Sequence, residues 1–351
     1  MTEAGELRLI DVSPLLAAPL DESRPDVETV AGEIDLACRH DGFFRIIGHG
    51  IDPRLFDVMS ASARDFFGRP EDEKAEVTMA KAGAAWRGWF PVGGELTSGR
   101  PDRKEGLYVG LDHGSDHPRV REGNPLHGPN LFPADPPELG PAIRSWLEAV
   151  TPVAHAVMRG IALGLGLRST WFEDHLTADP TILFRVFHYP PVDPADPSQW
   201  GVAEHTDYGL LTLLAQDDRG GLQVDGGHEW IDVPADPGVL VCNIGDMLDR
   251  LTEGRYRSTP HRVMNMSGRS RLSFPFFFDP SWDAVVTPLP LESPLESPLE
   301  SPLDGSNPAG AAAEAARRWD GTSVKLWDGT YGEYLSAKVA KVFPELFASL
   351  D

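Results

Sequence analysis

The chain has 351 residues, of which 41% are hydrophobic, so it can bury the core of one large domain or of two ordinary ones. Its 54 acidic and 31 basic residues give a formal charge of −23, which argues against nucleic acid and anionic membranes as partners. The two cysteines, Cys38 and Cys242, have no CxxC-type neighbour, which excludes a disulfide framework and a zinc ribbon.

The N-terminal part of the chain predicts two helices around one strand. Its acidic start lacks a signal-peptide pattern and no window approaches the length of a membrane span, so we expect a cytoplasmic protein that is a monomer or a weak homo-oligomer. Apolar residues at helical spacing predict a helix that Gly42 ends, followed by a strand in "FFRIIGHGI" and a second helix over 53–68. From about 80 to 135, the density of Gly, Pro and aromatic residues predicts a folded loop region without regular elements.

The remainder of the chain predicts a mainly β core with framing helices. The longest helical pattern covers 138–167. Between Thr181 and Asp279, short apolar or alternating runs separated by Gly, Pro and Asp predict a sandwich or jelly roll, and helices follow at about 307–318 and 331–349. We therefore expect an N-terminal helical and loop region over 1–135 and a catalytic core over 136–351, working as one functional unit.

A repeat interrupts this pattern at 291–303, with the sequence "LESPLESPLESPL". Proline at every fourth position forbids a helix interior and disfavours a central strand. We interpret 288–306 as an exposed, proline-rich loop insertion without a catalytic role.

The chemistry of the chain is indicated first by "HTD" at the head of an apolar run. His205 and Asp207 are two residues apart, so on an extended segment both side chains point to the same face and can bind one ion. A third ligand is available in His261, which opens another strand-like run after a Ser-Thr-Pro turn. Two histidines and one carboxylate form the facial triad of non-haem Fe(II) oxygenases, which leaves positions open for a cosubstrate and dioxygen.

A second signal lies in "SRLSFPFFF", where Arg271, Ser273, Pro275 and Phe277 fall on one side of a predicted strand. A guanidinium inside an apolar barrel is costly unless it binds a carboxylate, and a hydroxyl two residues further on can hold the same anion. A dicarboxylate that reaches from the metal to Arg271 fits this pattern.

The order HxD, H and RxS resembles the isopenicillin-N-synthase-like branch of the Fe(II)/2-oxoglutarate-dependent oxygenases. The similarity extends over nearly the whole chain: "DGFFRIIGHGI", "FRVFHYPP", "GGLQV", "NIGDML" and "TYGEYLSAKVAKVFPEL" resemble segments of that family. The resemblance implies a double-stranded β-helix, or jelly roll, with framing helices. It also implies Fe(II), 2-oxoglutarate as cofactor and dioxygen as cosubstrate.

By this resemblance, His205, Asp207 and His261 are the iron ligands, while Arg271 and Ser273 hold the distal carboxylate of 2-oxoglutarate. Tyr189 matches a tyrosine that contacts either cosubstrate or substrate in relatives. The family often has an asparagine where this chain has Phe187, which puts an amide contact to the cosubstrate in doubt.

The substrate is expected to be a small metabolite, and its contacts are predicted in the loop region and in the last core strand. Arg87, Glu95 and Tyr108 are candidate polar contacts, and Phe277 is a candidate inward-facing aromatic. We predict hydroxylation with release of succinate and CO2. The alternatives are oxidative ring closure without 2-oxoglutarate, ethylene formation at the same iron, and a non-catalytic binder of zinc or a small molecule.

Overall fold

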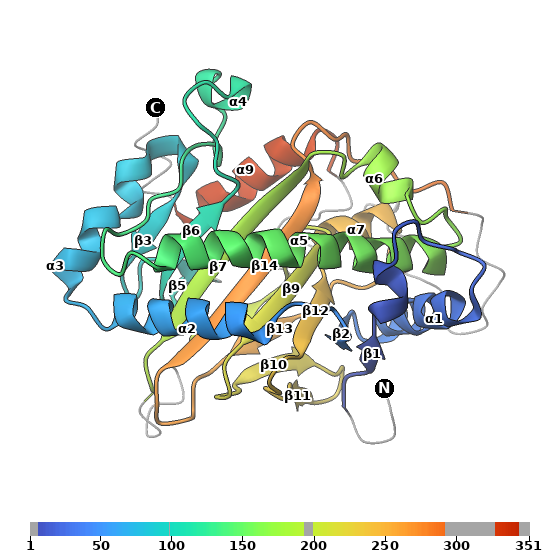
Figure 1. Ribbon diagram of the computed structural model, residues 1–351, viewed down its shortest axis with the longest axis horizontal. Coiled ribbons are helices and arrows are strands. Elements are labelled where there is room, and N and C mark those ends of the chain that lie inside the picture. Colours follow the sequence, from blue (N-terminus) through green and yellow to red (C-terminus); the bar gives the residue numbers. More distant parts are fainter. Residues whose placement is uncertain (1–5, 98, 193–198, 292–326, 344–351) are drawn as a thin grey trace.

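Two β-sheets form the centre of the protein, and long helices cross the outer face of the larger one (Figure 1). The computed structural model describes residues 6–97, 99–192, 199–291 and 327–343. The larger sheet has eight strands in the order β1-β2-β12-β9-β14-β7-β6-β3, and the smaller has four in the order β11-β10-β13-β8. Within these two sheets β1 and β2 pair in parallel, and the other pairs are antiparallel.

The strand bounds follow the apolar runs of the sequence. The larger sheet contains β1 (Leu9–Asp11), β2 (Phe43–Ile47), β12 (Leu240–Ile244), β9 (Leu211–Gln216), β14 (Arg271–Ser281), β7 (Pro180–Tyr189), β6 (Glu105–Gly110) and β3 (Gly88–Phe90). The smaller sheet contains β11 (Trp230–Asp232), β10 (Leu222–Asp225), β13 (His261–Val263) and β8 (Val202–His205). A short hairpin joins β4 (Leu96–Thr97) to β5 (Arg100–Pro101).

The sheets face each other across a cavity whose walls come from β7, β9 and β14 on one side and from β8, β10 and β13 on the other. Arg271, Ser273, Pro275 and Phe277 all line this cavity, as the alternation along β14 predicts. The expected β-rich core with framing helices is confirmed.

The framing helices cover the other face of the larger sheet. α1 (Pro25–His40) ends before Gly42, whose φ of +62° and whose contact with Arg257 leave no room for a side chain. α2 (Pro53–Phe67) and α5 (Leu139–Gly164) lie across the sheet in Figure 1, close to their predicted bounds. The shorter helices are α3 (Glu71–Lys74), α4 (Pro118–Arg121), α6 (Trp171–His175) and α7 (Asp246–Leu251), with 3-10 turns η1 (Ser13–Leu16), η2 (Ala75–Val77) and η3 (Met79–Ala85).

The prediction of a loop region over 80–135 is wrong in part, because this segment supplies β3 and β6 to the larger sheet. All six residues of β6 are buried. Gly106 in β6 serves packing rather than a turn, since a Cβ there would lie 2.6 Å from the Phe90 ring and 2.9 Å from the Phe187 ring. Gly106 therefore marks a close approach of aromatic side chains. An interpretation of glycine only as a residue that interrupts strands misses this role.

The described C-terminal segment forms α9 (Tyr331–Val342), which begins with a capping box between Thr330 and Glu333. The expected helix at 307–318, the remainder of the 331–349 helix, and the repeat beyond Leu291 lie outside the described residues. Within the part of the chain that the structure describes, no helix combines the length and apolar character needed to cross a membrane.

Candidate metal and cosubstrate site

Two histidines of the smaller sheet and an aspartate in the turn beside it converge, as the sequence predicts. His205 ends β8, Asp207 follows it in the next turn, and His261 opens β13. Because β13 pairs with β8 in a register that sets His261 opposite His205, two residues distant in sequence become neighbours. The ligand atoms of the three residues lie within 4.8 Å of one another, with Asp207 Oδ1 at 3.9 Å from His205 Nε2 and 3.7 Å from His261 Nε2.

Backbone carbonyls orient both imidazoles toward Asp207. His205 Nδ1 lies 2.8 Å from the Ala203 carbonyl and His261 Nδ1 lies 3.3 Å from the Thr259 carbonyl. Because a carbonyl only accepts, each Nδ1 carries the proton and each Nε2 lone pair is free to bind a metal. Burial lowers the pKa of both histidines, that of His261 to about 4, so both rings are neutral at physiological pH.

The carboxylate of Asp207 is fixed through its second oxygen. Oδ2 accepts hydrogen bonds from Thr212 Oγ1 at 2.6 Å and from Asn243 Nδ2 at 2.7 Å, which leaves Oδ1 directed at the histidines. Burial raises the pKa of Asp207, but the two histidines and these two donors outweigh it and lower the pKa overall. Two neutral nitrogens and one carboxylate oxygen are the donor set of the non-haem Fe(II) facial triad, so the residues present fit that metal.

Asn243 and Thr212 were missed as part of the site by sequence reasoning. Their neighbouring strands β12 and β9 pair with each other in a register that sets Asn243 opposite Thr212. Both side chains therefore reach the same carboxylate oxygen. Nothing in the local sequence marks them, because their role depends on strand pairing.

Arg271 is completely buried in the same cavity, and no carboxylate among the described residues pairs with it. Its Nε donates to the Gly220 carbonyl at 2.6 Å and its Nη2 donates to Gln216 Oε1 at 2.9 Å, while Nη1 has no hydrogen-bond partner in the described part of the chain. The guanidinium carbon lies 4.8 Å from the centroid of the Tyr189 ring. A buried guanidinium with a free donor and no anionic partner is suited to bind an acid.

Ser273 and Tyr189 line the same cavity wall as Arg271. The Ser273 hydroxyl donates to the Tyr189 hydroxyl at 3.3 Å, and both residues are buried. The cavity reaches from these groups to His205, Asp207 and His261. The structure thus brings all six predicted metal and cosubstrate residues to one cavity.

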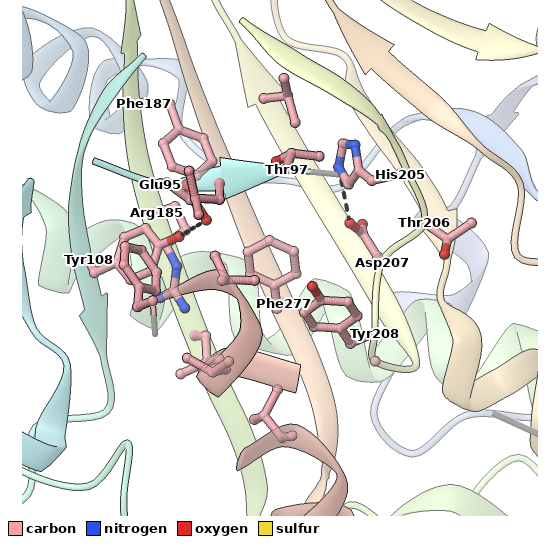
Figure 2. Close-up of a pocket in the computed structure, with 18 of the residues that line it drawn as sticks. Glu95, Thr97, Tyr108, Arg185, Phe187, His205, Thr206, Asp207, Tyr208 and Phe277 are labelled. Carbon is pink, nitrogen blue, oxygen red and sulfur yellow. Dashed lines mark hydrogen bonds and ion pairs between the residues drawn. The ribbon is translucent and has the colours of Figure 1, made fainter. Parts of the chain in front are cut away.

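A second cavity opens on the other side of His205 and Asp207, and Figure 2 shows the residues around it. Glu95, Tyr108 and Phe277, which the sequence analysis predicts as candidate substrate contacts, line this cavity. Sequence reasoning did not single out four further lining residues: Lys104, Arg185, Tyr208 and Asp279. The alternation of Arg185, Phe187 and Tyr189 along β7 was the available signal for Arg185, since alternate residues of a strand share a face.

Arg87 does not line this cavity. It is buried, donates from Nη2 to the Leu126 carbonyl at 2.8 Å, and faces a separate small cavity that His113 and His127 also line. His188 also points away from the cavity: its Nδ1 lies 2.9 Å from Glu105 Oε1, and its ring stacks on Phe67. A position in the predicted loop region was therefore insufficient to place the Arg87 side chain.

Two family models match the chain. The model of the 2OG-Fe(II) oxygenase superfamily matches residues 180–280, and the model described as the N-terminal part of non-haem dioxygenases in morphine synthesis matches residues 7–135. The first match contains the HxD, H and RxS residues. The second contains the loops and strands that supply Glu95 and Tyr108.

Three similar proteins cover most of the chain. A Dictyostelium discoideum protein named "Probable iron/ascorbate oxidoreductase" is 43% identical over 90% of this chain and 90% of its own length. A 1-aminocyclopropane-1-carboxylate oxidase of Dictyostelium mucoroides is 34% identical over 97% of this chain and 96% of its own. An Arabidopsis thaliana homoarginine-6-hydroxylase is 37% identical over 82% of this chain and 89% of its own.

A solved structure of similar fold is that of a full-length Neurospora crassa protein in complex with alpha-KG and thymine. It superposes with a TM-score of 0.74 and 26% identity, and the match covers 97% of this chain and 98% of that one.

Proposed function

Because the chain belongs to the 2OG-Fe(II) oxygenase superfamily, we propose that it hydroxylates a small polar metabolite and releases succinate and CO2 from 2-oxoglutarate. The protein is a non-haem iron oxidoreductase with a jelly-roll fold, and its cofactors are Fe(II) and 2-oxoglutarate, with dioxygen as cosubstrate. Hydroxylation is supported by the relatives named homoarginine-6-hydroxylase.

In this proposal His205, Asp207 and His261 hold the iron. The carbonyls of Ala203 and Thr259 keep both Nε2 atoms available, and the donors on Asp207 Oδ2 keep Oδ1 turned toward them. When bound, Fe(II) supplies the redox chemistry that activates dioxygen as 2-oxoglutarate loses CO2. The chain itself binds and orients the reactants and excludes water.

The buried guanidinium of Arg271 is the single observation that carries the assignment of 2-oxoglutarate binding. It lies in the cavity of the triad, keeps Nη1 without a protein partner, and has its other donors held by Gly220 and Gln216. A dicarboxylate with one end at the triad and the other at Arg271 supplies the anion that this cation needs. Ser273 and Tyr189 contribute hydroxyls on the same wall.

Substrate-dependent formation of succinate tests the proposed reaction. The protein with Fe(II), 2-oxoglutarate and dioxygen is expected to form succinate faster when a true substrate is present, in a one-to-one ratio with a product heavier by one oxygen atom. Ring closure or ethylene formation at the same iron is the second candidate, and a relative named 1-aminocyclopropane-1-carboxylate oxidase favours keeping it in the test. Ethylene in the headspace, or oxidised product without succinate, would contradict the hydroxylase proposal.

We also propose that the protein acts in the cytoplasm as a monomer or weak homo-oligomer, without nucleic acid as a partner. The formal charge of −23 and the two free, buried cysteines support this proposal. Sedimentation at micromolar concentration tests the oligomeric state, and fractionation of cells tests the location.

A further inference from the structure

The cavity beyond the triad contains a second buried arginine, Arg185, with which no carboxylate of the described residues forms an ion pair. Arg185 lies in β7 and is 6% exposed, and no carboxylate of the described chain lies within ion-pair distance of it. Its Nη1 donates two long hydrogen bonds, to the carbonyls of Val109 at 3.4 Å and Phe184 at 3.3 Å. Burial lowers the pKa of this guanidinium, which expresses the cost of keeping its charge away from water.

Aromatic rings hold the Arg185 guanidinium in place. Its central carbon lies 3.5 Å from the centroid of the Tyr108 ring and 5.8 Å from that of the Phe277 ring. Stacking of this kind fixes the plane of the guanidinium, but it does not supply a counter-charge. The arrangement therefore orients a cation toward the cavity without neutralising it.

The acidic residues nearest to Arg185 are already engaged with other partners. Glu95 lies 2.8 Å from Lys104 and accepts a hydrogen bond from the Tyr108 hydroxyl, while Lys104 also pairs with Asp102. Asp279 accepts from the Tyr331 hydroxyl at 2.6 Å and from the Leu210 backbone amide at 3.1 Å. Neither Glu95 nor Asp279 can therefore move onto Arg185 without breaking another buried contact.

The position of Arg185 relative to the triad suits substrate binding. In Figure 2, Arg185 and Tyr108 lie on one side of the cavity, His205 and Asp207 lie on the other, and Phe277 and Tyr208 lie between them. The remaining wall is largely apolar and includes residues of α9, namely Leu335, Val339 and Val342. A molecule that spans the cavity therefore meets a cation at one end, apolar surface in the middle and the metal site at the other end.

We propose that the primary substrate is a small carboxylic acid whose carboxylate pairs with Arg185 and whose apolar body packs between Phe277 and α9. The proposal rests on the proposed function, because it places the other end of the acid at the iron site. A neutral ring, such as the thymine in the similar Neurospora crassa complex, satisfies guanidinium N–H donors but leaves the buried charge uncompensated. An acid satisfies both, so the observations favour it.

The test uses matched pairs of compounds on the wild-type protein, so that it does not depend on a variant that folds. The panel contains amino acids and aliphatic or aromatic monocarboxylic acids, including homoarginine and 1-aminocyclopropane-1-carboxylate. Each acid is compared with its own primary amide. Thymine is added as a neutral ring. Without oxygen, binding is read from the change that each compound causes in the visible band of the Fe(II)–2-oxoglutarate chelate. With oxygen, the same compounds are scored by stimulated succinate formation.

We expect at least one acid to respond and its amide to bind at least about tenfold more weakly, because the amide cannot neutralise the guanidinium. Arg185→Met should weaken binding of that acid by at least about 30-fold, and Arg185→Lys should recover part of the loss. Arg144→Met is the matched control, since Arg144 is a surface arginine paired with Asp112, and it should leave the affinity unchanged.

Three results would overturn the inference while the chelate band still forms: amides or thymine that bind as well as the acids, an Arg185→Met variant with unchanged affinity for the acid, or no response to any acid. Failure of the wild-type protein to form the chelate band is a different result, because it contradicts the proposed function on which this inference rests.

Discussion

Replacing Arg271 by methionine removes the one arginine or lysine among the described residues that lines the cavity between the triad, Ser273 and Tyr189. Methionine keeps much of the side-chain volume and can follow the same path through the apolar wall. The change leaves two carbonyl-type acceptors without their donors, at Gly220 and Gln216. It also removes a buried charge that no carboxylate of the described residues neutralises.

The expected effect on 2-oxoglutarate binding is large. Loss of one member of a buried, hydrogen-bonded charge pair costs about 2–5 kcal/mol, which corresponds to about 30-fold or more in affinity. The Gly220 carbonyl and Gln216 Oε1, which lose their donor, destabilise the fold by about 1–3 kcal/mol each. Removal of the buried Arg271 charge offsets part of this loss. The variant should therefore fold, with lower thermal stability and a Michaelis constant for 2-oxoglutarate raised by at least about 30-fold.

The assay is succinate formation at increasing concentrations of 2-oxoglutarate, with Fe(II) and substrate held at saturation. Arg271→Lys keeps the charge but loses the planar fork, so its Michaelis constant should lie between those of wild type and Arg271→Met. Arg144→Met serves as the surface control. An unchanged Michaelis constant for 2-oxoglutarate in a folded Arg271→Met protein would refute the role given to Arg271.

Three further predictions concern residues around the metal site and the second cavity. Asp207→Ala removes the only anionic ligand of the triad and should abolish iron binding and turnover, so iron content and succinate formation near wild-type levels would contradict its assignment. Asn243→Ala removes a donor that holds Asp207 Oδ2 and should weaken Fe(II) affinity by about 10- to 100-fold in an iron titration of activity; an unaltered titration would show that this contact does not orient the ligand. Asp279→Asn should change how stability depends on pH. Burial holds the pKa of Asp279 at about 7, above its ordinary value of 3.8, so between these values the folded chain keeps a proton that the unfolded chain loses. Folding of the wild-type protein therefore becomes less favourable as pH rises through that window, while folding of Asp279→Asn does not change in this way. The free energy of unfolding of the variant minus that of wild type should increase by up to about 4 kcal/mol from pH 4 to 7, at about 1.4 kcal/mol per pKa unit. A difference that stays constant in denaturant titrations over this range would refute the buried, protonated state.

Much of the metal site was predictable from the sequence because it depends on short-range patterns. The two-residue spacing of His205 and Asp207 places both on one face, and alternation along β14 sets Arg271, Ser273 and Phe277 on one wall. The resemblance to a known family then joined these patterns with His261. The helices over 25–40 and 53–67 were also predictable, since apolar periodicity and a terminal glycine mark their ends.

The rest depends on contacts between segments far apart in the chain. Asn243 reaches Asp207 only because β12 pairs with β9, and Arg185 faces the second cavity only because β7 lies between β6 and β14. β6 was missed since Gly106 resembles a strand breaker until the aromatic rings packed against it are seen. Arg87 and Arg185 look alike as isolated arginines, and only the fold separates Arg185, which lines the second cavity, from Arg87, which does not.

Anaerobic addition of Fe(II) and 2-oxoglutarate to the folded protein, followed by absorption spectroscopy, tests directly whether the triad and Arg271 bind iron and 2-oxoglutarate together. The triad and Arg271 together predict the weak visible charge-transfer band of a 2-oxoglutarate–iron chelate, and they predict its loss in Asp207→Ala. A folded wild-type protein that binds neither Fe(II) nor 2-oxoglutarate, or that binds both without the band, would contradict the assignment of the triad and Arg271 as an Fe(II) and 2-oxoglutarate site.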